Sequence, residues 1–292
     1  MSSPDLSSTG SADAGPEEIT GKSGSTFFWP MLLLPRPKRT AMFAIYAFCR
    51  QVDDIVDEPG TPEAKRSALA AWREQIRSLY LGGAPASPVA VGLADAIARY
   101  HLPRGELEAV IDGMAMDLGT PMRAPSLDTF RVYCRRVAGA VGLLAIRVFD
   151  RADEETEAFA LAVGDALQMT NILRDLEEDA TLGRLYLPRE LLIRAGIVDT
   201  EPAKVLRHPS VGKACDALAD LAEARFTDAE RALARWPRRR LWTARAMMLL
   251  YHRMLTQLRA RGWGDLGRRP TLSKAEKAWV TMRCLIGQPP AR

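Results

Sequence analysis

The 292-residue sequence predicts an all-α protein, a helical bundle with a single domain. Apolar residues recur three and four positions apart over long stretches, which is the period of helices that bury one face. The alternating pattern typical of strands is nearly absent. The breaks between the periodic stretches carry Pro and Gly, as in Glu58-Pro-Gly, Gly119-Thr-Pro and Gly262-Trp-Gly.

Nine helices follow from this pattern, each ending near a breaker. They are expected at 37–57, 62–81, 88–100, 104–118, 126–149, 153–179, 202–235, 240–261 and 273–285. No break is long enough to link two domains, so we expect one domain over residues 24–286. Residues 1–23 are rich in Ser, Gly, Asp and Pro and lack the basic start and apolar block of a secretory signal. We expect them to form a disordered tail, and residues 287–292 to form a short second tail.

The composition indicates a soluble, cytoplasmic protein with enough apolar material for a core, since 47% of the residues are hydrophobic and 26% charged. The longest uninterrupted apolar stretch, residues 41–49, is far shorter than the ~20 residues that a membrane-spanning helix needs. The four cysteines form no CxxC pair, which suggests reduced thiols. The three histidines have no metal-ligand spacing, which argues against a zinc site.

The positive charge is concentrated at the carboxyl end. The net charge is +4, but residues 235–292 hold fourteen Lys and Arg against two acidic residues. Such a block can face nucleic acid, anionic lipid or a polyanionic substrate. We expect no nucleic-acid partner, because the arginines alternate with apolar helix positions and no nucleic-acid motif is present. We expect a peripheral contact with anionic membrane, because tryptophans accompany the arginines, although core packing would explain the same side chains: Trp236, Trp242, Trp263 and Trp279.

The first candidate site is the end of the helix expected at 37–57, where an apolar segment suddenly presents three carboxylates. Asp53 and Asp57 are four residues apart and share one helix face, whereas Asp54 points about 100° away. Like charges at this spacing repel each other, so a pair within apolar sequence favours a counterion such as Mg²⁺. A solvated helix end is an equally good interpretation of these residues alone.

The second candidate site lies in the helix expected at 153–179. Asn171, Asp175 and Asp179 follow one another at four-residue steps and form a row of oxygen donors, with Gln168 about one turn earlier. Oxygen ligands without His or Cys suit a hard cation such as Mg²⁺, which also binds phosphate oxygens and water. A surface helix also carries acids, but less often places Gln, Asn and Asp among apolar neighbours.

Together the two acidic helices predict a magnesium-diphosphate site in the interior of the bundle. Such a site neutralises the charge that develops on a leaving diphosphate, so that an allylic carbon–oxygen bond can ionise. Arg50, one turn before Asp53, and Arg184, just after the second motif, could assist the diphosphate. Either arginine is equally expected as an ion-pair partner of the aspartates.

Several blocks of sequence occur in a fixed order along residues 24–286. They are YAFCRQVDDIVDE at 46–58, YCRRVAGAVG at 133–142 and QMTNILRDLEEDATLGRLYLP at 168–188, preceded by SGSTFFW at 23–29. In this order the chain resembles the squalene/phytoene synthase family, whose two aspartate-rich motifs, central tyrosine block and amino-terminal segment they match. The resemblance implies the isoprenoid-synthase helical bundle with a central active-site cavity and a Mg²⁺ cofactor.

The resemblance also assigns roles to individual residues. It implies that the metal is held by Asp53, Asp57, Asn171, Asp175 and Asp179, and that the four aspartates and Tyr133 are catalytic. It places the substrate against Ser25, Thr26, Phe27, Tyr46, Arg50, Gln168, Arg184, Tyr186, Tyr251 and Arg268, with Asn171 also in reach. The serine and lysine details of the 23–29 segment differ from those of the family, which weakens the assignment of Ser25, Thr26 and Phe27.

Within the family, the segment at 33–58 and the carboxyl-terminal Arg-Ala-Arg-Gly-Trp are most similar to the bacterial branch that serves hopanoid synthesis. This similarity implies condensation of two farnesyl diphosphates to presqualene diphosphate, with downstream isoprenoid enzymes as partners. Phytoene synthesis from geranylgeranyl diphosphate and continuation to squalene with NADPH are the rival activities. A non-catalytic scaffold is disfavoured because every metal-site position is intact.

Overall fold

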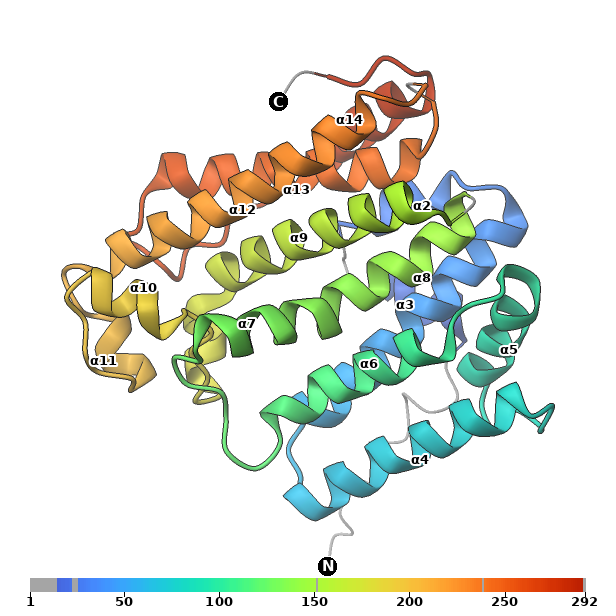
Figure 1. The fold of residues 1–292 in the computed structure, drawn as a ribbon, viewed down its shortest axis with the longest axis horizontal. Helices are drawn as coiled ribbons and strands as arrows, with labels where there is room; N and C mark the ends of the chain where they lie inside the picture. The colour runs from blue at the N-terminus through green and yellow to red at the C-terminus, as the bar shows by residue number, and fades with distance from the viewer. Residues whose placement is uncertain (1–14, 23–25, 151, 238, 291–292) are drawn as a thin grey trace, which may run out of the picture.

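The computed structural model describes residues 15–22, 26–150, 152–237 and 239–290, and these parts of the chain contain helices and no strand (Figure 1). An isolated β-bridge joins Arg123 to Leu185. The helices are α1 Pro16–Lys22, α2 Phe28–Leu32, α3 Arg36–Asp57, α4 Pro62–Tyr80, α5 Pro88–Tyr100, α6 Arg104–Met114, α7 Leu127–Cys134, α8 Ala140–Phe149, α9 Glu154–Thr181, α10 Arg189–Arg194, α11 Pro202–Leu206, α12 Val211–Leu233, α13 Trp242–Arg261 and α14 Lys274–Leu285. The predicted all-α class is confirmed.

Local sequence explains where the long helices begin and end. α9 starts with a capping box, in which the Asp153 carboxylate accepts from the Thr156 amide and the Thr156 hydroxyl accepts from the Asp153 amide. α3 ends at Asp57 because Glu58 precedes a proline and adopts extended backbone. Both acidic motifs therefore occupy the last turns of long helices, where the chain is about to leave the bundle.

Three expectations from the sequence differ from the structure. Residues 16–22 were expected in a disordered tail but form α1, which packs against α3 and α5 with Thr20 fully buried. The helix expected over 202–235 is two helices, α11 and α12, because Pro209 falls between them and disfavours helical backbone at His208. The helix expected over 126–149 runs through α7 and α8 but contains a π-helical turn, Arg135–Gly139, which adds a residue to the turn. The short helices α2 and α10 were not predicted.

The core consists of two clusters of buried apolar side chains. One cluster is built mainly on α9, α12 and α13, and the other on α3 to α6 and α8. Phe27, Phe149 and Trp242 pack against both clusters. The space between the clusters is therefore closed by aromatic side chains and surrounded by the long helices.

Two glycines allow α8 and α9 to approach closely along this space. A Cβ atom on Gly142 would lie 2.7 Å from the carbonyl oxygen of Ala160, and one on Gly164 would lie 3.0 Å from the backbone of Ala138. Contacts under 3.0 Å to backbone require the helices to move apart, so a side chain at Gly142 is excluded at this spacing. Among the described helices, none is both long and apolar enough to cross a membrane.

Candidate active site

An elongated chamber lies between the two core clusters. It encloses about 220 Å³ and is lined by side chains from α2, α3, α8, α9 and α13. Gln168 and Asn171 line its polar end toward the acidic turn of α9, whereas Phe159, near the start of the same helix, and Phe149, tied to the start of α3, line its apolar end. A dry cavity of about 150 Å³ is already large enough to bind benzene. The chamber is thus suited to a hydrocarbon chain whose polar end lies toward the acidic turn of α9.

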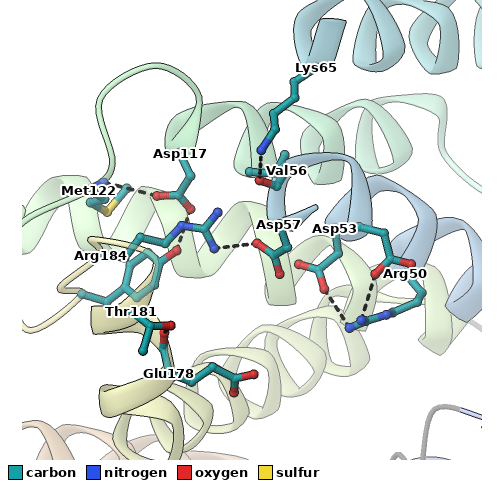
Figure 2. A network of polar contacts seen from close by, with 12 residues as sticks. Arg50, Asp53, Val56, Asp57, Lys65, Asp117, Met122, Glu178, Thr181 and Arg184 are labelled. Atoms are coloured by element: carbon teal, nitrogen blue, oxygen red, sulfur yellow. Dashed lines mark hydrogen bonds and ion pairs between the residues drawn. The ribbon is translucent and has the colours of Figure 1, made fainter. Parts of the chain in front are cut away.

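Two arginines from different parts of the chain form ion pairs with the aspartates at the end of α3. Arg50 lies 3.1 Å from the Asp53 carboxylate and 2.8 Å from that of Asp54. Arg184, which follows α9, donates to Asp57 at 2.6 Å. Figure 2 shows the Arg184 guanidinium between Asp57 and Asp117, with Arg50 on the far side of Asp53. These arginines therefore ion-pair with the aspartates in this structure.

The acidic row on α9 has its own cationic partners. Arg174 donates two hydrogen bonds to Asp175, at 2.8 and 2.5 Å, and Arg269 lies 2.8 Å from the same carboxylate. Arg269 also pairs with Glu178. Asp179 is left facing Asp175 one turn away. A pair of arginines thus balances one carboxylate of the row and not the other.

The electrostatics of the acidic residues suit the binding of a cation. Burial, and then the charge of Asp57, raises the pKa of Asp53 to about 7. Burial, and then the charge of Asp175, raises the pKa of Asp179 to about 7. The side-chain oxygen of Asn171 is buried without a hydrogen-bond partner among the described residues.

These oxygen donors fit a hard divalent cation, although the described residues contain no ready-made cluster of three His, Cys, Asp or Glu ligands. Magnesium usually takes one or two carboxylates and completes its shell with phosphate oxygens and water. Asp53 with Asp57 on α3, and Asn171 with Asp175 and Asp179 on α9, could each supply that share. The donor set therefore fits ions that are completed by a bound diphosphate.

Two tyrosines stack beside the acidic residues. The rings of Tyr133 and Tyr186 are 4.8 Å apart and nearly parallel, and both side chains are buried. Tyr186 donates to Asp117 at 2.6 Å. Burial raises the pKa of Tyr133 well above its usual range, so the phenol is neutral. Asp117 is buried at the end of a short 3-10 segment, Ala115–Asp117, that follows α6.

The aromatic residues expected at the substrate are brought together at the chamber. Phe27 stacks on Tyr251 with a ring separation of 5.1 Å, and Tyr46 lines the chamber beside Phe27. Thr26 is buried next to them. Ser25 lies outside the described residues. The chamber wall thus carries the aromatic rings of Phe27 and Tyr46, and Tyr251 supports the ring of Phe27 from behind by stacking.

The sequence pattern did not predict which arginines contact the acidic row on α9. Arg268, expected at the phosphate, is exposed, and the structure brings its neighbour Arg269 to Asp175. Both belong to an irregular segment between α13 and α14, where no periodicity orders neighbouring residues. Arg174, the residue before Asp175, folds its long side chain onto that carboxylate. The adjacent Arg-Asp pair in the motif was the signal available for that contact.

Comparisons with known proteins agree with this architecture. Residues 20–276 match the family model of squalene/phytoene synthase. The presqualene diphosphate synthase of Rhodopseudomonas palustris is 40% identical over 263 residues, covering 90% of this chain and 94% of that protein. The enzyme of the same name from Zymomonas mobilis is 42% identical over 270 residues, covering 92% and 91%. A crystal structure of squalene synthase from Alicyclobacillus acidocaldarius has a TM-score of 0.75 and 28% identity, covering 84% of this chain and 92% of that one.

With family-model agreement along most of its length, and with close full-length relatives, the chain belongs to the squalene/phytoene synthase family.

Proposed function

We propose that this protein condenses two molecules of farnesyl diphosphate head to head to presqualene diphosphate and releases one diphosphate. The observation that carries the proposal is an apolar chamber whose polar end meets acidic turns from α3 and α9. The choice of product is supported by the two relatives that bear the name presqualene diphosphate synthase. Hopanoid or squalene synthesis would consume it.

Magnesium would be held by Asp53 and Asp57 on α3 and by Asn171, Asp175 and Asp179 on α9. When bound, it would neutralise the charge that develops on the departing diphosphate. Arg50 and Arg184 would turn from their aspartates toward phosphate oxygens, and Arg174 would keep Asp175 in place. Arg268 and Arg269, in the segment before α14, would contact the bound diphosphate.

The carbon chemistry would take place inside the chamber. The first farnesyl group ionises at C1, and the C2–C3 double bond of the second attacks that carbon. Loss of a proton from the same C1 then closes a cyclopropane ring, and the second diphosphate stays on the product. Phe27 and Tyr46 line the chamber, and Tyr251 stacks on Phe27, so these rings would stabilise a nearby cation while the apolar wall would exclude water. Tyr133 and Gln168 would orient the reacting end.

The proposal includes peripheral contact with a membrane and transfer of the product to downstream isoprenoid enzymes. Presqualene diphosphate carries two long prenyl chains and partitions into lipid, because each buried CH₂ favours transfer from water by about 0.8 kcal/mol. An enzyme near the cytoplasmic face of a membrane could release it directly into that phase. No reductive step is required for this product.

The test is incubation with farnesyl diphosphate and Mg²⁺, with and without NADPH, and mass spectrometry of the products before and after phosphatase. We expect presqualene alcohol after phosphatase, unchanged by NADPH and absent in excess chelator. Squalene that appears only with NADPH would show a second half-reaction. A higher kcat/KM for geranylgeranyl diphosphate, with phytoene as product, would replace the proposal. Full turnover in chelator would reject the magnesium site.

A further inference from the structure

One surface of the protein exposes large apolar side chains from two neighbouring helices. Trp279, Met282 and Ile286 lie three and four residues apart on α14 and share its outer face. Leu32 and Leu33 lie at the end of α2, which packs against α14. Each of the five is between 37% and 49% exposed. We call these residues the α2–α14 face.

The inner side of α14 is tightly packed, so the exposure of its outer side chains does not come from loose packing of the helix. Val280 and Cys284 are completely buried, and Thr281 is nearly so. The helix therefore has two apolar sides, one in the core and one directed outward. A second apolar stripe on a well-packed helix marks a contact with another phase or molecule.

Cationic side chains border the α2–α14 face. Arg39 donates to the carbonyl oxygen of Leu32 at 3.2 Å, and Arg239 donates to that of Ile286 at 3.4 Å. Arg36 is exposed three residues beyond Leu33. The neighbouring acid Asp150 is already paired with Arg240 at 2.5 Å. The border of the face therefore carries positive charge.

The face differs from the set of tryptophans that the sequence suggested for membrane contact. Trp236 is buried against Phe159, and Trp263 donates to Asp216. Trp242 packs between the two core clusters. Trp279 is the exposed member of the four and belongs to the α2–α14 face.

One end of the face, with Leu33 and Ile286, lies near the apolar end of the chamber. Phe149 lines the chamber and also lines a second hollow, together with Leu34, Lys38, Arg239 and Trp242. Lys38 donates to the carbonyl oxygen of Phe149 at 2.7 Å, which ties the start of α3 to the end of α8. Figure 1 shows α8 and the start of α3 meeting at this end of the bundle. Phe149 thus separates the chamber from a surface hollow beside Arg239.

We propose that the α2–α14 face docks onto an anionic lipid bilayer, with Trp279, Met282, Ile286, Leu32 and Leu33 in the lipid and the arginines at the headgroups. An apolar strip with a basic border is the chemistry of an interfacial helix on anionic lipid. The reason for docking rests on the proposed function, since a prenylated product formed in the chamber would then be released next to lipid. The binding itself requires only the face.

A second copy of the protein fits the face less well than a bilayer does. Two copies joined through the same surface would bring Arg36, Arg39 and Arg239 of one copy toward those of the other. Anionic headgroups, in contrast, would neutralise each of these side chains. The charge border therefore favours lipid over self-association.

The test is co-sedimentation of the full-length protein with vesicles of phosphatidylcholine alone and with about one third phosphatidylglycerol, at low and moderate salt. The variant is Met282→Glu combined with Ile286→Glu, and a second variant is Arg239→Glu. The control is Val198→Glu, which places one glutamate at an apolar side chain that is 90% exposed and belongs to the segment between α10 and α11. Circular dichroism and condensation of farnesyl diphosphate in vesicle-free solution are measured for every variant.

We expect the wild type to bind the anionic vesicles, with binding weakened by salt. The double variant should lose at least about tenfold in partition coefficient, Arg239→Glu should lose several-fold on anionic vesicles, and Val198→Glu should bind as the wild type does. Absence of wild-type binding, equal losses in the control, or a dimer that only the face variants dissociate would each overturn the proposal. Failure of condensation in all forms, with vesicle binding unchanged, would instead reject the proposed function.

Discussion

Asp53 and Asp175 occupy equivalent places in the two acidic helices, each next to an arginine and one turn from another aspartate. Asp53→Asn and Asp175→Asn should each lower turnover at least about 100-fold, because each removes charge that would stabilise the departing diphosphate. Asp112→Asn is the control, since Asp112 is also a helical aspartate in an ion pair, with Arg73, but does not line the chamber. Steady-state kinetics at saturating Mg²⁺ measures the effect, and near-normal rates in either variant would make that motif structural.

Asp179 allows a test of the site that does not depend on activity. Because its pKa is raised from 3.8 to about 7, the folded protein holds a proton there that the unfolded chain has lost. The unfolding free energy should therefore fall as pH rises from about 4 to 7, and stay lowered above that range. In chelator at pH 8, Asp179→Asn should raise the free energy of unfolding by about 1 kcal/mol after allowance for solvent screening.

The comparison is made by thermal or urea unfolding at pH 5 and pH 8. Magnesium should stabilise the wild type at pH 8 more than it stabilises Asp179→Asn, because the variant lacks the uncompensated carboxylate. A variant that is less stable than the wild type at pH 8 in chelator would show that Asp179 is held by favourable contacts.

At the scale of the helix, the close approach of α8 and α9 sets the width of the chamber. Gly142→Ala would place a methyl group 2.7 Å from the Ala160 carbonyl oxygen, and should destabilise the protein by about 2 kcal/mol and reduce turnover. Gly105→Ala, in the exposed part of α6 with no atom near its Cβ position, should be neutral or stabilising. Equal stability of the two variants in urea unfolding would contradict the packing argument.

The end of α8 should set the length of the substrate. Phe149 bounds the apolar end of the chamber, so Phe149→Ala should increase kcat/KM for geranylgeranyl diphosphate relative to farnesyl diphosphate by about tenfold. Phe226→Ala is the control for lost packing, because that ring is buried on α12 and does not line the chamber. An unchanged ratio would show that another residue limits chain length.

Helix periodicity predicted the long helices well, because each buries one face and ends at a Pro or Gly signal. It also predicted that Asp53 with Asp57, and Asn171 with Asp175 and Asp179, would share helix faces, since that follows from spacing alone. It did not predict the π-helical turn after α7, because a single inserted residue leaves the apolar pattern almost unchanged. Nor did it predict α1, whose stability comes from packing against α3 and α5.

For the whole molecule, several contacts of the site join residues far apart in the sequence, and residue spacing within a helix could not predict them. Arg184 reaches Asp57 across 127 residues, and Tyr186 reaches Asp117 across 69. Arg269 meets Asp175 from a segment without regular structure. The fold also places acidic residues and arginines at one end of the chamber, and Leu33 and Ile286 of the α2–α14 face near the other. This polarity is the basis for expecting diphosphate chemistry at one end and release of a greasy product at the other.

The most direct test of head-to-head condensation is the deuterium content of the product made from farnesyl diphosphate that carries two deuterium atoms at C1. Closing the cyclopropane removes one hydrogen from C1 of the ionised molecule and none from C1 of the other. After phosphatase treatment, mass spectrometry should therefore show a C30 alcohol that retains three of the four deuterium atoms. A C30 product that retains all four, or labelled farnesol as the sole product, would contradict the proposed reaction.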